Sequence, residues 1–298
     1  MKKIFFFFII FFLFLCPTIL LAQKPLSVIT TIEPLAFLIE KIGGDKVSVS
    51  IMIPSHGNPH TYEPLPSQLK DLSQADLYVQ VGSGIEFELS WLDKLLSMNK
   101  KMALCNAGKN IALIPLQERK FDHEKINKDD HDHDHEGNDP HIWMSPKNVI
   151  VMTKNILDSL IAIDPGNEDF YTRNADQLIK QLTALIQEIS SELSTLTYRT
   201  ILVFHPAWGY FAKDFSLMQL AVESYGKEPT PKQLTEIIKE TKEKNIKIIF
   251  ASPQFSQKSA NVIAQEIKGQ VLLIDPLEKD YINNLKKAAE AFSKISYE

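Results

Sequence analysis

Cysteine is scarce in this sequence. Cys16 and Cys105 are the only two among 298 residues, and Cys16 lies in an apolar N-terminal segment. If that segment is removed, Cys105 has no partner for an internal disulfide. The mature chain must then be held together by its hydrophobic core, which a chain of this length can build.

No long apolar run occurs after residue 22. The apolar run within residues 1–22 has the layout of a secretory signal peptide. Two lysines precede an apolar run from Ile4 to Leu15, and Ala22 supplies a small residue before the expected cut. We therefore expect residues 1–22 to be a signal peptide and the mature protein to lie in the periplasm. The alternatives are an uncleaved membrane anchor and a lipid anchor on Cys16. Leu15 argues against the lipid, because lipidation sites want a small residue there.

Clusters of lysine and arginine are also missing. The chain has 32 basic and 37 acidic residues, for a formal net charge of −5. Eight acids against two lysines fall between residues 122 and 141, so the rest of the mature chain is close to neutral. A nucleic-acid partner is excluded, because its surface would need clustered positive charge.

Two catalytic signatures are absent as well. The sequence contains neither a His-Glu-x-x-His helix nor the Gly-x-Ser-x-Gly turn of an α/β-hydrolase. These absences argue against a hydrolase, and we expect the protein not to be an enzyme.

What is present is a regular alternation of strand and helix patterns, which predicts βαβ units and parallel sheets. Short β-branched runs predict strands at 26–32, 47–53, 77–82, 102–106, 200–204, 219–224, 246–251 and 271–274. Helical periodicity predicts helices at 33–42, 67–75, 86–98, 167–196, 230–244, 256–268 and 281–292, and helix on both sides of Asp164.

The longest helical pattern divides the chain. Residues 167–196 carry an apolar stripe long enough for a rod of about 45 Å. We therefore predict an α/β fold of two lobes, each with a four-stranded, mostly parallel sheet flanked by helices, joined by one long rigid helix. The predicted domains are 23–163, the linking helix 164–196, and 197–298.

Histidines are concentrated in one acidic stretch. Five of the eight fall between residues 123 and 141, and His131, His133 and His135 alternate with acidic residues. Short His-rich tracts indicate metal binding. We predict that His123, His131, His133 and His135 form a secondary, low-affinity metal loop, here called the His-rich loop (residues 122–138). The alternative is a flexible acidic linker.

Four more candidate ligands follow predicted strands. Ligand sites in open α/β sheets form beyond the carboxyl ends of the strands, where His60, His141, His205 and Asp275 fall. Each of these alone is more often a cap or turn residue. Each histidine adjoins a proline, however, and stiff loops suit fixed ligand geometry. We therefore predict a metal site in a cleft between the lobes.

Residues near these candidates have weaker assignments. His56 is expected to be incidental or to support the site indirectly, while Tyr62 and Glu63 are candidates for orienting the ligands. The aromatic side chains of Trp143, Trp208 and Tyr210 are expected to wall the cleft.

Several segments resemble the metal-binding receptors of bacterial ABC importers for zinc and manganese, and among these the high-affinity zinc-uptake receptors. The matching segments are 58–67 (NPHTYEPLPS), 139–146 (DPHIWMSP), 204–211 (FHPAWGYF), 226–231 (GKEPTP) and 275–277 (DPL). The resemblance implies one Zn²⁺ ion held by His60, His141 and His205, with Asp275 or water as the fourth ligand. It also implies delivery of that zinc to a membrane permease, and we expect a monomer.

The residue at position 205 bears on the choice of metal. The resemblance implies that manganese receptors of this family have a carboxylate at the position of His205. Three imidazoles with at most one carboxylate make a softer site, which favours Zn²⁺ over Mn²⁺. Pro59 stands where some zinc members have an acidic residue, so the fourth ligand stays open. The alternatives are a manganese receptor, a zinc-dependent hydrolase, and an adhesin, for which the sequence offers no specific feature.

Overall fold

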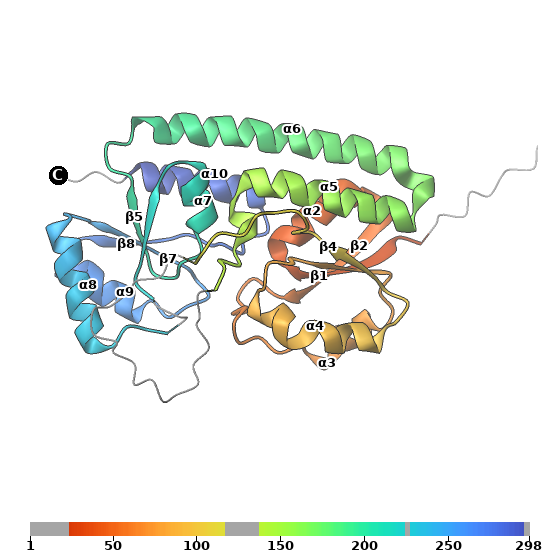
Figure 1. Cartoon of the computed structure of the whole chain (residues 1–298), viewed down its shortest axis with the longest axis horizontal. Coiled ribbons are helices and arrows are strands. Elements are labelled where there is room, and N and C mark those ends of the chain that lie inside the picture. The colour runs from red at the N-terminus through yellow and green to blue at the C-terminus, as the bar shows by residue number, and fades with distance from the viewer. Residues whose placement is uncertain (1–23, 117–136, 224–226, 295–298) are drawn as a thin grey trace, which may run out of the picture.

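Two parallel sheets form the framework of the molecule. The computed structural model describes residues 24–116, 137–223 and 227–294 (Figure 1). The predicted signal peptide and the residues His123, His131, His133 and His135 lie outside these ranges.

The first sheet is built from the N-terminal part of the chain. Its strands are β1 (Leu26–Ile32), β2 (Val47–Ile53), β3 (Leu77–Gln80) and β4 (Ala103–Asn106), in the order β2-β1-β3-β4. All three pairings are parallel. Its helices are α2 (Glu33–Gly43), α3 (Pro66–Leu72), α4 (Glu86–Met98) and α5 (Pro146–Ile163). Ser145 caps α5 by accepting a hydrogen bond from the Asn148 N–H, and Pro146 takes the first helical position.

The second sheet repeats this arrangement. Its strands are β5 (Thr200–Val203), β6 (Met218–Ala221), β7 (Ile248–Ala251) and β8 (Gln270–Leu273), in the order β6-β5-β7-β8 and again all parallel. Its helices are α7 (Gly209–Asp214), α8 (Pro231–Glu243), α9 (Lys258–Glu266) and α10 (Tyr281–Ser293). The predicted fold class is confirmed. The sequence patterns missed α7, because its six residues are too few for a periodic stripe.

The long helix α6 (Glu168–Glu192) joins the lobes. It packs against α2 and α5 of the first lobe and α10 of the second, and Figure 1 shows it along one side of both. Its buried stripe consists of Tyr171, Ala175, Leu178, Leu182, Leu185 and Ile189. The helix has 25 residues and ends at Glu192, where a 3₁₀ turn begins, so it is shorter than the predicted 167–196.

A single hydrophobic core crosses from one lobe to the other. It includes Ile39 of α2, Leu178 of α6 and Phe292 of α10, all essentially inaccessible to solvent. A smaller core lies between the second sheet and the helices α8 and α9. The shared core makes the two lobes one rigid unit, because moving them apart would expose close-packed apolar side chains.

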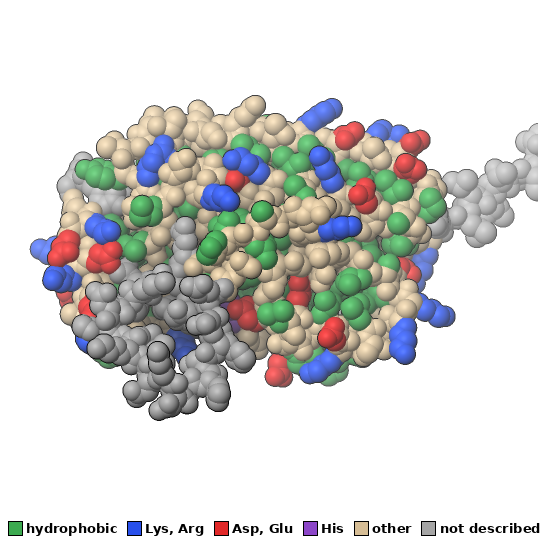
Figure 2. All heavy atoms as spheres, viewed as in Figure 1, with side chains coloured by type: hydrophobic (Ala, Val, Ile, Leu, Met, Phe, Trp, Pro, Cys, Tyr) green, Lys and Arg blue, Asp and Glu red, His purple; other side chains and the backbone are tan. Residues whose placement is uncertain are grey.

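The surface carries no large cluster of positive charge on the face in view. In Figure 2 the lysine and arginine side chains lie scattered over both lobes. Within the described residues, no helix has the length and apolarity that a bilayer span requires.

Candidate metal centre

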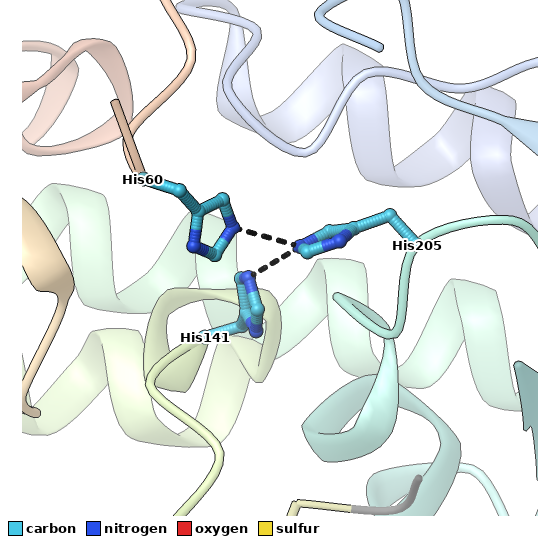
Figure 3. Close-up of side chains that lie close together, drawn as sticks. All are labelled: His60, His141 and His205. Atoms are coloured by element: carbon cyan, nitrogen blue, oxygen red, sulfur yellow. Dashed lines mark hydrogen bonds between the residues drawn. The ribbon is translucent and has the colours of Figure 1, made fainter. Parts of the chain in front are cut away.

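The three predicted histidines meet at one point between the lobes. Nε2 of His205 lies 3.3 Å from Nε2 of His60 and 3.2 Å from Nε2 of His141 (Figure 3). Among the described residues, these three form the one group of three or more side chains whose potential ligand atoms all lie within 4.8 Å of one another. Three imidazole nitrogens converging in this way form a site that suits Zn²⁺.

Each histidine comes from a different segment of the chain. His60 lies in the loop after β2, and His205 lies in the loop after β5. His141 directly precedes a 3₁₀ turn of buried residues, Ile142–Met144, which anchors its backbone in the core. The side chains of His141 and His205 are 8% and 5% exposed, whereas that of His60 is 21% exposed. His60 is therefore the histidine on the solvent side of the site.

A carboxylate contacts the other ring nitrogen of every histidine. Nδ1 of His60 lies 2.9 Å from Glu86, Nδ1 of His141 lies 2.8 Å from Asp139, and Nδ1 of His205 lies 2.8 Å from Glu223. Such a partner keeps the proton on Nδ1 and leaves the Nε2 lone pair free for a metal. All three rings are thus oriented as ligands.

Sequence reasoning missed these carboxylates. It named Tyr62 and Glu63 instead, but the Tyr62 hydroxyl donates to Gln68 at 3.1 Å. Asp139 could have been found, because it stands two positions before His141 in an Asp-Pro-His motif. Glu86 and Glu223 stand far from their histidines in sequence, so no local pattern connects them.

Asp139 is held in an unusually tight place. Its side chain is fully buried, and its Oδ1 accepts a hydrogen bond from the His141 backbone N–H at 2.9 Å as well as contacting the ring. A Cβ added to Gly209 would lie 2.4 Å from Asp139 Oδ2. Glycine at position 209 therefore makes room for the carboxylate that orients His141.

Burial sets the electrostatics of His205. Burial and the neighbouring His141 and His60 hold the pKa of His205 well below its usual value of 6.5. Burial also raises the pKa of Glu223 to about 7. The ring of Phe255 stacks on His205 with centroids 4.4 Å apart and an angle of 23°. His205 is thus kept neutral, the form that binds a metal.

Asp275, predicted as the fourth ligand with water as the alternative, is not among the potential ligand atoms that converge within 4.8 Å. Its Oδ1 accepts hydrogen bonds from Gln254 Nε2 at 2.7 Å and from the Leu277 N–H at 2.8 Å. Burial raises its pKa, although these hydrogen bonds oppose the change. His56 is exposed and also lies outside the group.

The aromatic rings that contact the histidines differ in part from those predicted to wall the cleft. Trp143 lies against His141 with ring centroids 5.3 Å apart, as expected. Tyr210 supports the site from behind, because its hydroxyl donates to the Asp139 carbonyl at 3.1 Å. Trp208 packs against Phe211 and Phe292 in the core. Phe255, which stacks on His205, was not predicted.

The described ends of the segment that contains the His-rich loop lie side by side next to the site. Pro115 and Asn138 form an antiparallel bridge, and the Leu116 N–H donates to the Gly137 carbonyl at 3.0 Å. The Asp139 N–H donates in turn to the Ile114 carbonyl at 2.8 Å. The loop therefore leaves and re-enters the fold at the segment that carries Asp139 and His141.

Residues 28–295 match the model of a family described as zinc-uptake complex component A, periplasmic. The chain belongs to this family. A solved ZnuA structure is 37% identical, with a TM-score of 0.82, and the likeness covers 91% of this chain and 99% of that one. A ZnuA deletion mutant with zinc bound matches equally well, with 37% identity, a TM-score of 0.82, and coverage of 92% and 99%.

Streptococcal relatives match over most of this chain. The laminin-binding protein of Streptococcus agalactiae, whose structure is described as bifunctional with adhesin and metal-transporting activity, is 27% identical. Its TM-score is 0.78, with coverage of 91% of this chain and 99% of that one. The zinc-binding lipoprotein AdcA of Streptococcus pneumoniae is 29% identical over 96% of this chain, which spans 58% of the length of that relative.

Family membership decides between two of the alternatives. The family is described as a component of a zinc-uptake complex, and this description fits a binding protein and not a zinc-dependent hydrolase.

Proposed function

We propose that this protein captures Zn²⁺ outside the cytoplasmic membrane and delivers it to the permease of an ABC importer. The observation that supports this most is the convergence of three Nε2 atoms, each on a ring whose Nδ1 contacts a carboxylate. The zinc is cargo in this proposal, so the site must both bind the ion tightly and give it up.

The ligands favour zinc over manganese. Three neutral imidazoles form a site that suits a tetrahedral borderline ion, whereas Mn²⁺ prefers carboxylate and water oxygen. The zinc-bound ZnuA mutant supports the same choice. Manganese remains the alternative cargo within the family.

The fourth ligand is either Asp275 or water. Asp275 is not among the potential ligand atoms that lie within 4.8 Å of one another, which favours water. Replacing Asp275 with Asn tests this choice. If the fourth ligand is water, Asp275→Asn should change zinc affinity by no more than roughly threefold, whereas loss of a carboxylate ligand should weaken binding much further.

The location outside the membrane rests on the N-terminus and on the family. Residues 1–22 have the layout of a signal peptide, and the family is described as periplasmic. We therefore propose export through a cleaved signal, with a lipid anchor or an uncleaved membrane anchor as the less favoured forms. Mass spectrometry of the mature N-terminus would distinguish them.

Calorimetric titration tests the central proposal. The wild-type protein should bind one Zn²⁺ tightly and Mn²⁺ much more weakly in direct competition. Replacing His60, His141 or His205 with Ala should abolish the tight event, while His56→Ala, the matched control in the same loop as His60, should leave it unchanged. Tight zinc binding that survives all three substitutions would show that the site is elsewhere.

An adhesin role is a second candidate, because the laminin-binding relative is described as having that activity. Binding of the purified protein to immobilised laminin, with and without zinc, tests it. The result of this experiment does not affect the proposal that the protein captures zinc.

A further inference from the structure

We infer that Gln254 acts as a latch that holds the loop carrying His60 over the site and thereby slows the release of zinc. The inference rests on the proposed zinc-binding function. Gln254 is not one of the converging ligands; it lies in the loop between β7 and α9, in the second lobe.

The amide of Gln254 connects the two lobes. Its Nε2 donates to the backbone carbonyl of Ser55 at 2.8 Å and to Oδ1 of Asp275 at 2.7 Å. Ser55 belongs to the loop after β2, whereas Asp275 follows β8. Both partners accept hydrogen bonds and neither can donate here, so the amide must face them with its NH₂ group.

The position of the amide has a cost that suggests a role. Its oxygen Oε1 is buried and lacks a hydrogen-bond partner among the described residues. An unsatisfied buried carbonyl oxygen is unfavourable and calls for an explanation. The two donated hydrogen bonds explain why the oxygen is buried, because they can form only if the amide enters the space between the lobes.

His60 depends on this loop more than the other two histidines do. The His141 segment is locked to the second lobe, because Trp143 Nε1 donates to the Pro276 carbonyl at 2.8 Å and the Tyr281 hydroxyl donates to the Trp143 carbonyl at 2.8 Å. His205 belongs to the second lobe itself. His60 reaches the site from a surface loop, and it is the most exposed of the three.

Two consecutive turns connect the latch to His60. The Gly57 N–H donates to the Pro54 carbonyl at 2.7 Å, and the His60 N–H donates to the side chain of Asn58 at 2.9 Å. Ser55, the partner of Gln254, lies within the first turn. Because hydrogen bonds stiffen both turns, fixing the Ser55 carbonyl also restricts the position of His60.

The neighbour of Gln254 closes the same side of the site. Phe255 stacks on His205, and its ring centroid lies 6.0 Å from that of His60. Gln254 and Phe255 therefore join the β7–α9 loop to both the His60 loop and the site. Since the shared core keeps the lobes rigid, withdrawal of the His60 loop is the smallest movement that removes a ligand and exposes the ion.

The test compares zinc release from the wild type and from two variants. Gln254→Met keeps the length of the side chain but removes both donors, and Gln257→Met is the matched control in the same loop. In stopped-flow experiments with a chromophoric chelator, Gln254→Met should release zinc about tenfold faster, and Gln257→Met should behave like the wild type. The melting temperature of the metal-free protein should fall by only a few degrees in Gln254→Met and should not change in Gln257→Met, which shows that both variants stay folded.

A double-mutant cycle shows whether the effect passes through His60. Competition with chelators of graded strength measures the zinc affinity of the wild type, Gln254→Met, His60→Ala and the double variant. The weakest chelators are used for the two variants without His60, which keep only the residual binding of His141 and His205. Gln254→Met should weaken zinc binding about tenfold in the wild type but less than about twofold in the His60→Ala background. Equal weakening in both backgrounds, or unchanged release from Gln254→Met, would overturn the latch.

The same experiments separate this inference from the proposed function. A wild-type chain without one-to-one zinc binding would refute the proposed function itself. Tight binding together with unchanged release from Gln254→Met would refute the latch alone.

Discussion

His205 Nδ1 lies 2.8 Å from Glu223 Oε2, and the two side chains are only 5% and 4% exposed. In its ionised form Glu223 keeps the proton of the ring on Nδ1 and directs Nε2 toward His60 and His141. A histidine ligand without such a partner would have to lose rotational freedom and select its tautomer when the metal binds.

Glu223→Gln should therefore weaken zinc binding by roughly 10- to 100-fold. An amide can turn its NH₂ group toward Nδ1, and the ring would then carry its proton on Nε2, where the metal binds. Competition titration measures the loss, and Glu290→Gln is the control because Glu290 is exposed on α10. Wild-type affinity in Glu223→Gln would mean that the carboxylate does not orient the ligand.

Gly209→Ala should reduce both stability and zinc affinity. The new methyl group would meet Asp139 Oδ2 at 2.4 Å inside the core, and overpacking of this kind costs about 1–3 kcal/mol. Displacement of Asp139 would also turn His141 away from the site. Denaturant unfolding and zinc titration measure the two effects. Gly137→Ala is the control, since nothing lies within 4 Å of the added Cβ there, and it should leave both quantities unchanged.

Removal of the His-rich loop should leave tight binding intact. The bridge between Pro115 and Asn138 holds the two ends together, so residues 117–136 can be replaced by a short glycine-serine turn. The shortened protein should bind one zinc tightly and lose the weaker additional equivalents, as counted by calorimetry. If the deletion removed the tight event instead, the primary site would have to include the loop.

Chelation should lower the melting temperature without unfolding the protein. The core that joins the lobes consists of apolar side chains and needs no metal. At a free zinc concentration of about 1,000 times Kd, binding adds about 4 kcal/mol to the free energy of unfolding, or roughly 8–16 °C for a chain of this size. Circular dichroism with and without a chelator measures both quantities. Loss of helical signal on chelation at 25 °C would show that the metal is part of the fold.

Much of the framework could be predicted because its signals are local. The strands Leu26–Ile32 and Val47–Ile53 and the helix Glu86–Met98 match their predicted bounds, since β-branched runs and apolar periodicity report directly on burial. The three histidines could be named because each stands beside a proline in a connection that follows a parallel strand, and the carboxyl ends of such strands share one edge of a sheet.

The carboxylate partners could not be predicted in this way. Glu86 begins a helix and Glu223 follows β6, and charged residues are common in both positions on any α/β protein. Which of them contacts a histidine depends on the order of strands within each sheet and on how the two sheets face one another. The contact between Gln254 and Ser55 spans 199 positions of the chain and depends on the same arrangement.

The sequence alone determined the alternation of strand and helix, the family, and the three imidazoles, because these depend on residue type and short-range spacing. Only the tertiary structure decided that one core unites the lobes, that each imidazole has its own carboxylate, and that Asp275 hydrogen-bonds to Gln254. Those relationships join segments far apart in the chain, and such distances are set by packing, which no local pattern encodes.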